Sequence, residues 1–177
     1  MPRMPQPATA PHHVVVMGVA GCGKSAIGAR LAHELGVPLV EGDAFHPASN
    51  IEKMRQGLPL DDGDRAGWLQ RLAQELARSS GGAVLACSAL KRAYRDTLRS
   101  GAPGLRFVHL SLTPQQALQR VATRADHFYP PSLVASQFEA LEDPRGEPGV
   151  LAVDADRPLD DIAREAARWL RAEFNNP

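Results

Sequence analysis

Residues 14–35 constrain the fold more than any other part of the chain. The segment opens with the continuous apolar run 14–17, which is typical of a strand buried on both faces. A glycine-rich turn follows at 18–25, and apolar residues then recur at helical spacing until Gly36 ends the pattern. A strand, a glycine-rich loop and a helix in this order predict the first unit of a parallel sheet covered by helices.

The rest of the chain repeats this alternation of strand and helix. Short apolar runs predict further strands at 37–40, 83–87, 106–110 and 150–153. Helical spacing predicts helices at 47–54, 61–79, 90–98, from 113 onwards, 132–141 and 159–170. The expected fold is therefore α/β, a doubly wound five-stranded parallel sheet flanked by helices. Ligands of such folds bind at the carboxyl ends of the strands.

Length and composition favour one soluble domain. The chain has 177 residues, a formal net charge of zero and two cysteines. We expect a disordered leader at 1–11, which holds four prolines, and a single domain at 12–177. Zero net charge gives no reason to expect nucleic acid or a membrane as partner. No apolar run approaches a membrane span, and the cysteines form no disulfide or zinc pattern, so we expect a cytoplasmic protein.

The glycine-rich turn matches G-x-x-x-x-G-K-[ST] in full. Its backbone N–H groups would surround phosphate oxygens, Lys24 would reach the β- and γ-phosphates, and the Ser25 hydroxyl would bind Mg²⁺. Cys22 is either a thiol open to alkylation or a small residue in place of serine, and we favour the second. The predicted ATP-binding loop consists of Gly18, Val19, Ala20, Gly21, Cys22, Gly23, Lys24 and Ser25.

Other features narrow the class of nucleotide-binding protein. No N-K-x-D motif for reading guanine is present, and the length leaves little room for a motor or a translocating ATPase. The class that remains is the small-molecule kinases. The expected third strand ends at Cys87-Ser88 without the usual acidic residue, so the nucleotide, waters and acids elsewhere would complete the Mg²⁺ shell.

Glu41 and Asp43 follow the predicted second strand. Alternate positions on an extended segment point to one side, so we expect the two carboxylates to act together. Asp43 is the candidate substrate-binding residue and catalytic base, and Glu41 the candidate for the Mg²⁺ shell through water. Two solvated acids in a surface turn are the alternative.

Two clusters of cations stand near the other strand ends. Arg120 and Arg124 lie four apart on a predicted helix, and an aperiodic segment follows them. We expect a mobile lid at about 120–142 whose arginines steady the transferring phosphoryl group and bind ATP. Lys91, Arg92 and Arg95 would suit an anionic substrate, or form a solvated helix face.

Together these motifs resemble those of the gluconokinases of the thermoresistant type. The resemblance covers about residues 12–172 and rests on the loop, on E-G-D-A-F-H-P at 41–47, and on N-x-x-K-M followed by G-x-P-L-x-D-x-D-R-x-x-W-L at 50–69. The segments A-C-S-A-L-K-R at 86–92, Q-F-E at 137–139 and V-D-A-D at 153–156 also fit. Glu41 and Cys22 stand where the family often has aspartate and serine.

The resemblance implies a P-loop kinase fold shared with adenylate and shikimate kinases, and transfer of the γ-phosphoryl group of ATP to the 6-hydroxyl of D-gluconate. It also implies a homodimer. Asp156 and Pro158 fall in the region that lies against adenine in this family. The expected substrate-binding residues are Asp43, His46, Lys53, Lys91, Arg95 and His127, with Arg65 and Trp68 as structural supports.

Two alternatives stay open from the sequence. One is a related kinase acting on another sugar acid or a shikimate-like polyol. The other is a regulatory protein that binds a nucleotide without catalysis, although the retention of Lys24, Ser25, Asp43 and both lid arginines argues against it.

Overall fold

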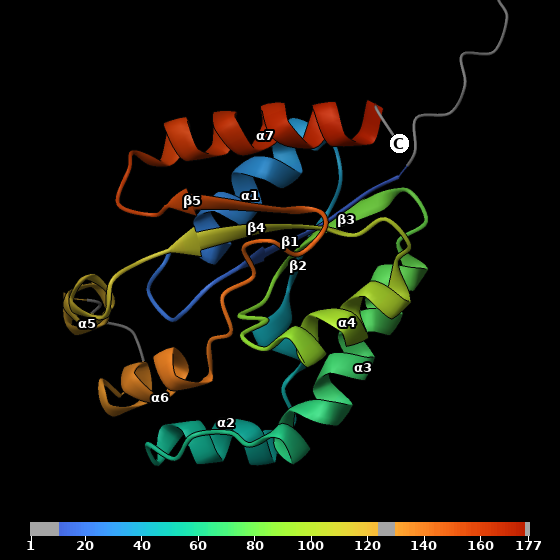
Figure 1. Ribbon diagram of the computed structural model, residues 1–177. Coiled ribbons are helices and arrows are strands. Elements are labelled where there is room, and N and C mark those ends of the chain that lie inside the picture. The colour runs from blue at the N-terminus through green and yellow to red at the C-terminus, as the bar shows by residue number, and fades with distance from the viewer. Residues whose placement is uncertain (1–10, 124–129, 176–177) are drawn as a thin grey trace, which may run out of the picture.

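A computed structural model describes residues 11–123 and 130–175 of the chain. Five strands form one sheet in the order β2-β3-β1-β4-β5, and every neighbouring pair is parallel. The strands are β1 His12–Met17, β2 Leu39–Glu41, β3 Gly82–Ala86, β4 Arg106–Ser111 and β5 Val150–Asp154. The predicted doubly wound parallel sheet is confirmed (Figure 1).

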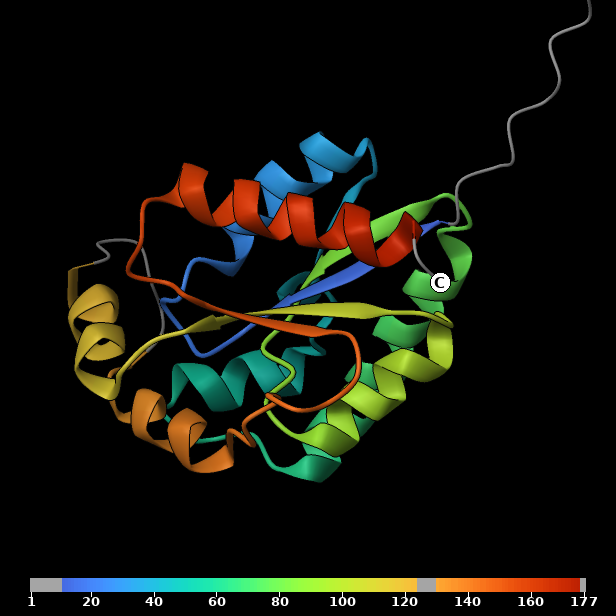
Figure 2. The same cartoon turned by 45° about the horizontal axis from the view of Figure 1, so that its top comes forward.

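Helices cover both faces of the sheet. They are α1 Lys24–Leu35, α2 Ala48–Arg55, α3 Asp62–Arg78, α4 Arg92–Gly101, α5 Pro114–Thr123, α6 Ser132–Ala140 and α7 Leu159–Asn175, with a short 3₁₀ helix η1 at Gly42–Phe45. The pair α1 and α7 packs on one face and the pair α3 and α4 on the other (Figures 1 and 2). Helices α2, α5 and α6 lie beyond the carboxyl ends of the strands.

The core has two halves, one on each face of the sheet. In β1, Val14 and Val16 belong to the half under α1 and α7, whereas Val15 and Met17 belong to the half under α3 and α4. All four side chains are fully buried, because neighbouring residues of a strand point to opposite faces. A central parallel strand therefore needs apolar residues at every position, which is the pattern that the sequence shows.

The boundary between α1 and β2 differs from the prediction. Gly36 adopts the left-handed conformation with φ 66°. The N–H groups of Gly36 and Val37 donate to the carbonyls of His33 and Ala32, which is the Schellman arrangement at a helix end. Val37 therefore completes the helix cap, and the strand begins only at Leu39.

The segment after β2 also differs from the prediction. Residues 42–45 form η1 rather than extended chain. The indole N–H of Trp68 donates to the carbonyl of Gly42 at 2.8 Å, and a Cβ at position 42 would come 2.7 Å from the carbonyl oxygen of Ala86. This tight turn thus depends on a glycine and on a contact with α3.

Within the described part of the chain, none of the helices combines the length and the apolar character that a membrane span requires.

Candidate active site

The loop between β1 and α1 has the conformation that its glycines allow. Gly18, Gly21 and Gly23 all have positive φ, at 147°, 82° and 96°. A Cβ on Gly18 would lie 2.7 Å from both Cys22 Sγ and the Leu110 carbonyl oxygen, so no larger residue fits there. Cys22 is buried beneath the loop, which supports the interpretation of a small packing residue over an exposed thiol.

The side chain of Lys24 folds back onto the backbone of this loop. Its Nζ donates to the carbonyls of Gly18 at 3.1 Å and Val19 at 3.2 Å. An ammonium group over glycine-rich backbone at the N-terminus of a 12-residue helix makes a site for an anion. The geometry is that of a phosphate-binding loop.

Ser25 and Glu41 lie together beside the loop. The Ser25 hydroxyl donates to Glu41 Oε2 at 2.9 Å. A hydroxyl and a carboxylate are oxygen ligands of the kind that Mg²⁺ takes alongside phosphate oxygens and water. Among the described residues, no group of three or more histidine, cysteine, aspartate or glutamate side chains could hold a metal by itself. The donor set therefore fits a Mg²⁺ ion that arrives with a nucleotide.

Strand β3 adds no acid here. Cys87 is buried, and burial raises the pKa of its thiol to about 12, so it stays protonated.

Asp43 and His46 face each other across η1. Asp43 Oδ1 lies 3.7 Å from His46 Nε2, and the Asp43 side chain is 88% exposed. The imidazole stacks on Trp68 with ring centroids 4.0 Å apart, and His46 Nδ1 lies 3.2 Å from Asn50 Nδ2. Burial lowers the pKa of His46, although the Asp43 charge opposes this shift.

The expectation that Glu41 and Asp43 act side by side on an extended segment is not met. Glu41 bonds to Ser25, whereas Asp43 lies within the 3₁₀ turn beside His46. The turn therefore separates the two acids, with Glu41 beside Ser25 of the phosphate-binding loop and Asp43 beside His46.

A cavity of about 420 Å³ joins these groups. Lys24, Ser25, Asp43 and His46 all line it, together with Ser88 after β3. Helices α2 and α6 supply an apolar wall that includes Ile51, Met54 and Leu133. An open volume of this size between a phosphate-binding loop and an acid–imidazole pair can hold a polar small molecule next to a nucleotide.

Arg120 reaches the loop from α5. Its guanidinium donates to the carbonyls of Gly21 at 3.2 Å and Ala155 at 2.8 Å, and it lies 3.5 Å from Asp156. Arg120 thus connects the phosphate-binding loop to the segment between β5 and α7, where Asp156 and Pro158 were predicted to bind ATP. Arg124 and His127 lie outside the described residues.

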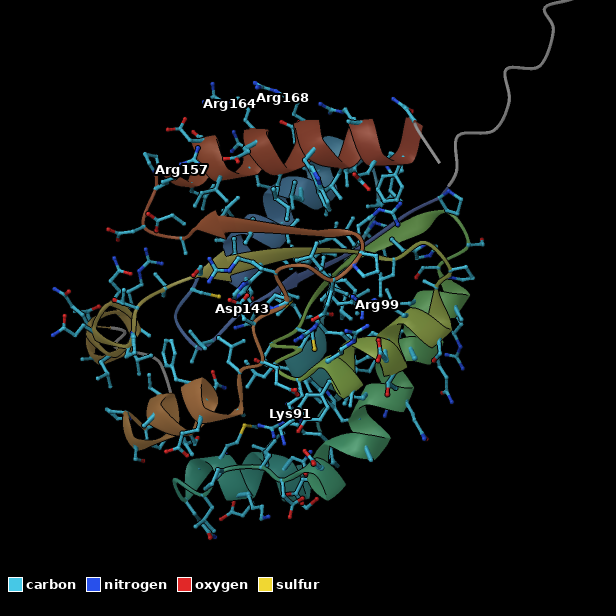
Figure 3. All side chains as sticks on the ribbon, in the orientation of Figure 1. Lys91, Arg99, Asp143, Arg157, Arg164 and Arg168 are labelled. Atoms are coloured by element: carbon cyan, nitrogen blue, oxygen red, sulfur yellow. The ribbon has the colours of Figure 1, made fainter. Side chains whose placement is uncertain are left out.

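The predicted substrate lysines are held by neighbouring acids. Lys53 Nζ donates to Asp64 Oδ2 at 2.6 Å, and Lys91 Nζ donates to Asp62 Oδ1 at 3.0 Å. Lys91 stands at the N-terminal end of α4 (Figure 3). Neither lysine lines the cavity, so a direct contact with substrate would need these ion pairs to open.

Arg95 does not reach the cavity, contrary to the prediction. Its side chain is fully buried and pairs with Glu147, whose Oε2 lies 2.6 Å from Arg95 Nη2. The same guanidinium donates to the carbonyls of Ala89, Leu90 and Glu142. These buried hydrogen bonds connect α4 to the segment before β5. Arg95 therefore has a structural role in this fold.

Three residues that line the cavity were not predicted from the sequence to contact a ligand. Arg65 and Trp68, taken as supports, both line the cavity, and Gln137 was noted only as part of a motif. Arg65 and Trp68 are three residues apart and so share a face of α3. Gln137 follows the buried Leu133 by one helical turn, and a polar residue on an apolar stripe was the available signal.

Comparison with known proteins identifies the family of the chain. A family model described as an AAA domain matches residues 14–148. The thermoresistant gluconokinase of Escherichia coli (strain K12) is 43% identical over 156 residues, covering 85% of this chain and 89% of that protein. The chain belongs to the gluconokinase family. A second relative, the gluconokinase of Gluconobacter oxydans (strain 621H), is 42% identical over 166 residues, or 92% of this chain and 93% of the relative.

A solved gluconokinase structure has the same fold. The crystal structure of a gluconokinase from Sinorhizobium meliloti 1021 superposes with a TM-score of 0.87 at 48% identity, over 94% of this chain and 95% of that one. The resemblance seen in the motifs is thus confirmed over most of the chain, and the fold is that of a P-loop kinase.

Proposed function

We propose that the chain phosphorylates D-gluconate at its 6-hydroxyl with Mg-ATP, giving 6-phospho-D-gluconate and ADP. The observation that supports this proposal is that Lys24 and Ser25 of the phosphate-binding loop line the same cavity as Asp43 and His46. Family membership supports the acceptor, because the relatives that cover most of the chain are named gluconokinases.

Each of these residues has a separate role in the proposed phosphoryl transfer. The acceptor oxygen attacks the γ-phosphorus, and the bond to the bridging oxygen breaks with its electron pair leaving on ADP. Asp43 takes the proton of the acceptor hydroxyl. Lys24 and the loop N–H groups bind the phosphate oxygens and stabilise charge in the transition state. Ser25, with Glu41 beside it, would hold Mg²⁺, and the ion would supply positive charge to the phosphate groups.

The acceptor side offers polar groups suited to a sugar acid. His46 and Arg65 line the cavity, and Arg55 lies on the same wall. We propose that these groups bind the carboxylate and hydroxyls of gluconate, whose recognition needs paired donors and acceptors. Lys53, Lys91 and His127 remain proposed contacts, and Asp156 and Pro158 remain proposed neighbours of adenine.

The proposal extends to the assembly and to closure of the site. We infer that the enzyme works in the cytoplasm as a homodimer. We also infer that the segment at about 120–142 acts as a lid, and that Arg120 and Arg124 stabilise the transferred phosphoryl group. The contacts of Arg120 with the Gly21 carbonyl and with Asp156 support a role at the nucleotide.

The direct test is an assay with Mg-ATP and a panel of acceptors. D-gluconate, other sugar acids and shikimate are each incubated with the protein, and ADP release and the product mass are measured. We expect turnover with gluconate and a mass gain of one phosphoryl group. Turnover of shikimate or another acid without gluconate would assign a different acceptor, and ATP binding without transfer to any acceptor would make the chain a nucleotide-binding regulator.

A further inference from the structure

Gln137 connects α6 to the phosphate-binding loop. The backbone N–H of Ala20 donates to Gln137 Oε1 at 2.6 Å, across 117 positions of the chain. Ala20 is the third residue of the loop, and Gln137 lies in the middle of α6, the helix that follows residues 124–129. The sequence pattern and the phosphotransfer scheme above give this side chain no role.

The Ala20 bond fixes which way the amide of Gln137 faces. A backbone N–H must meet an acceptor, so the oxygen points to the loop and the NH₂ group points away from it. We find no hydrogen bond from this NH₂ group to another residue of the described chain. The only buried side-chain nitrogen or oxygen without a partner in those residues is His109 Nδ1, so Nε2 of Gln137 is not sealed in the interior.

The NH₂ group therefore belongs to the cavity. Gln137 lines it together with Lys24 and Asp43, the groups that flank the path of the transferred phosphoryl group. A neutral amide donor suits an anionic oxygen there, because it donates a hydrogen bond but is too weak an acid to transfer its proton to the phosphate or to Asp43. The Ala20 N–H polarises the amide and so strengthens its NH₂ donors.

We propose that Gln137 binds the γ-phosphoryl group of ATP. Oε1 holds the Ala20 N–H, and Nε2 donates a hydrogen bond to a γ-phosphoryl oxygen in ATP and in the transition state. No bond to Gln137 forms or breaks, and the proton of the acceptor still goes to Asp43. The inference deepens the proposed function and rests on it for the identity of the reaction.

Binding of two nucleotides tests the contact without any acceptor. Affinities for ADP and for a non-hydrolysable ATP analogue, both with Mg²⁺, are measured by calorimetry for the wild type, Gln137→Met and Gln137→Glu. In Gln137→Met we expect the analogue to bind about tenfold more weakly relative to ADP, as loss of a hydrogen bond to a charged group predicts. In Gln137→Glu the carboxylate can still accept from Ala20, but it faces the γ-phosphoryl group with a negative charge. We therefore expect a larger relative loss there.

Kinetics provide the second readout. With saturating gluconate and ATP, we expect kcat to fall about 10- to 100-fold in Gln137→Met and further in Gln137→Glu. A residue that merely held the loop would behave differently. Both nucleotides would weaken together in Gln137→Met, and Gln137→Glu would keep the wild-type ratio because its bond to Ala20 survives. Either result would overturn the proposal.

Two controls complete the experiment. Gln115→Met makes the same chemical change on an exposed residue of α5, and its nucleotide ratio and kcat should match the wild type. Thermal unfolding of each variant verifies that it is folded. If the wild type transfers no phosphate to gluconate, the proposed function fails, whereas the ratio of the two nucleotide affinities still decides the role of Gln137.

Discussion

Lys24 is held by the carbonyls of Gly18 and Val19, which places one positive charge over the loop. Replacing it with alanine removes that charge from the transition state. We expect Lys24→Ala to lower kcat by about two orders of magnitude or more, as loss of an electrostatic stabiliser does. The measurement is ADP release under saturating substrates. A variant with more than half of the wild-type kcat would show that the lysine does not contact the transferred group.

Asp43 is the residue on which the chemistry of the acceptor depends. Its side chain is 88% exposed, so Asp43→Ala should leave the thermal midpoint nearly unchanged. We expect kcat to fall by about 10²–10⁴-fold, the range for loss of a general base, while ATP binding is kept. Near-wild-type turnover would remove Asp43 from the role of base and leave it as a surface acid beside His46.

At the scale of elements, the start of α3 depends on a reciprocal cap. Asp61 Oδ1 accepts from the Asp64 N–H at 2.7 Å, and Asp64 Oδ2 accepts from the Asp61 N–H at 3.0 Å. Removing an N-cap side chain typically costs about 1 kcal/mol. We expect Asp61→Ala to lower the free energy of unfolding by about that amount in a urea titration, whereas Asp61→Asn, which keeps an acceptor oxygen, should lose less.

The junction between α4 and the segment before β5 depends on a buried ion network. Glu147 accepts from Arg95 at 2.6 Å and from Arg99 at 3.0 Å, and Arg99 lies on α4 (Figure 3). Burial opposes the charge of Glu147, but the hydrogen bonds from both arginines outweigh it and hold the pKa of the carboxyl below its usual value.

Breaking this network should cost stability rather than substrate affinity. Removing one partner of a buried pair costs about 3–5 kcal/mol, because the other charge is left uncompensated. We expect Arg95→Met to lower the free energy of unfolding by about that amount, while the KM for gluconate of the folded fraction stays within about twofold of the wild type. A large rise in KM at unchanged stability would instead restore Arg95 as a direct substrate contact.

For the whole molecule, burial of histidines makes stability depend on pH. Burial is the largest cause of the lowered pKa of His12, His46 and His109. Their pKa in the unfolded chain is near 6.5, so below that pH the unfolded state binds protons that the folded state does not. The free energy of unfolding is therefore expected to fall as pH drops from about 7 to about 5.

His109 offers a single-residue check of this dependence. His109→Gln removes one of the three groups and should give a shallower slope of unfolding free energy against pH in the same range. The comparison uses urea titrations at several pH values. Equal slopes for variant and wild type would show that protonation of His109 is not coupled to unfolding.

The arrangement of the whole chain was largely predictable because its signals are local. Apolar runs, helical spacing and the G-x-x-x-x-G-K-S loop need only neighbouring residues to be recognised, and they predict the sheet, the helices and the nucleotide site. Ser25 and Glu41, which the motifs assign to the same Mg²⁺ ion, do lie together in the structure and are only 16 positions apart.

What the sequence could not predict depends on distant partners. Arg95 looks like any cation on a helix until Glu147, 52 positions later, is found against it in the interior. Residues 42–45 become a 3₁₀ turn because Trp68 binds the Gly42 carbonyl from α3. The orientation of the Gln137 side chain depends on its hydrogen bond with Ala20, which lies 117 positions earlier. Such contacts are decided by tertiary packing, and a local pattern does not identify the distant partner.

The burial of Cys22 and Cys87 gives this chain a practical property. Thiol-directed dyes require an accessible thiolate, and neither cysteine presents one at the surface of the folded protein. Cysteines introduced at the exposed Glu52 on α2 and Glu139 on α6 would therefore be the only labelled positions. A donor and an acceptor fluorophore at these two sites would report, by energy transfer, whether the two walls of the cavity approach each other when ATP and gluconate are added.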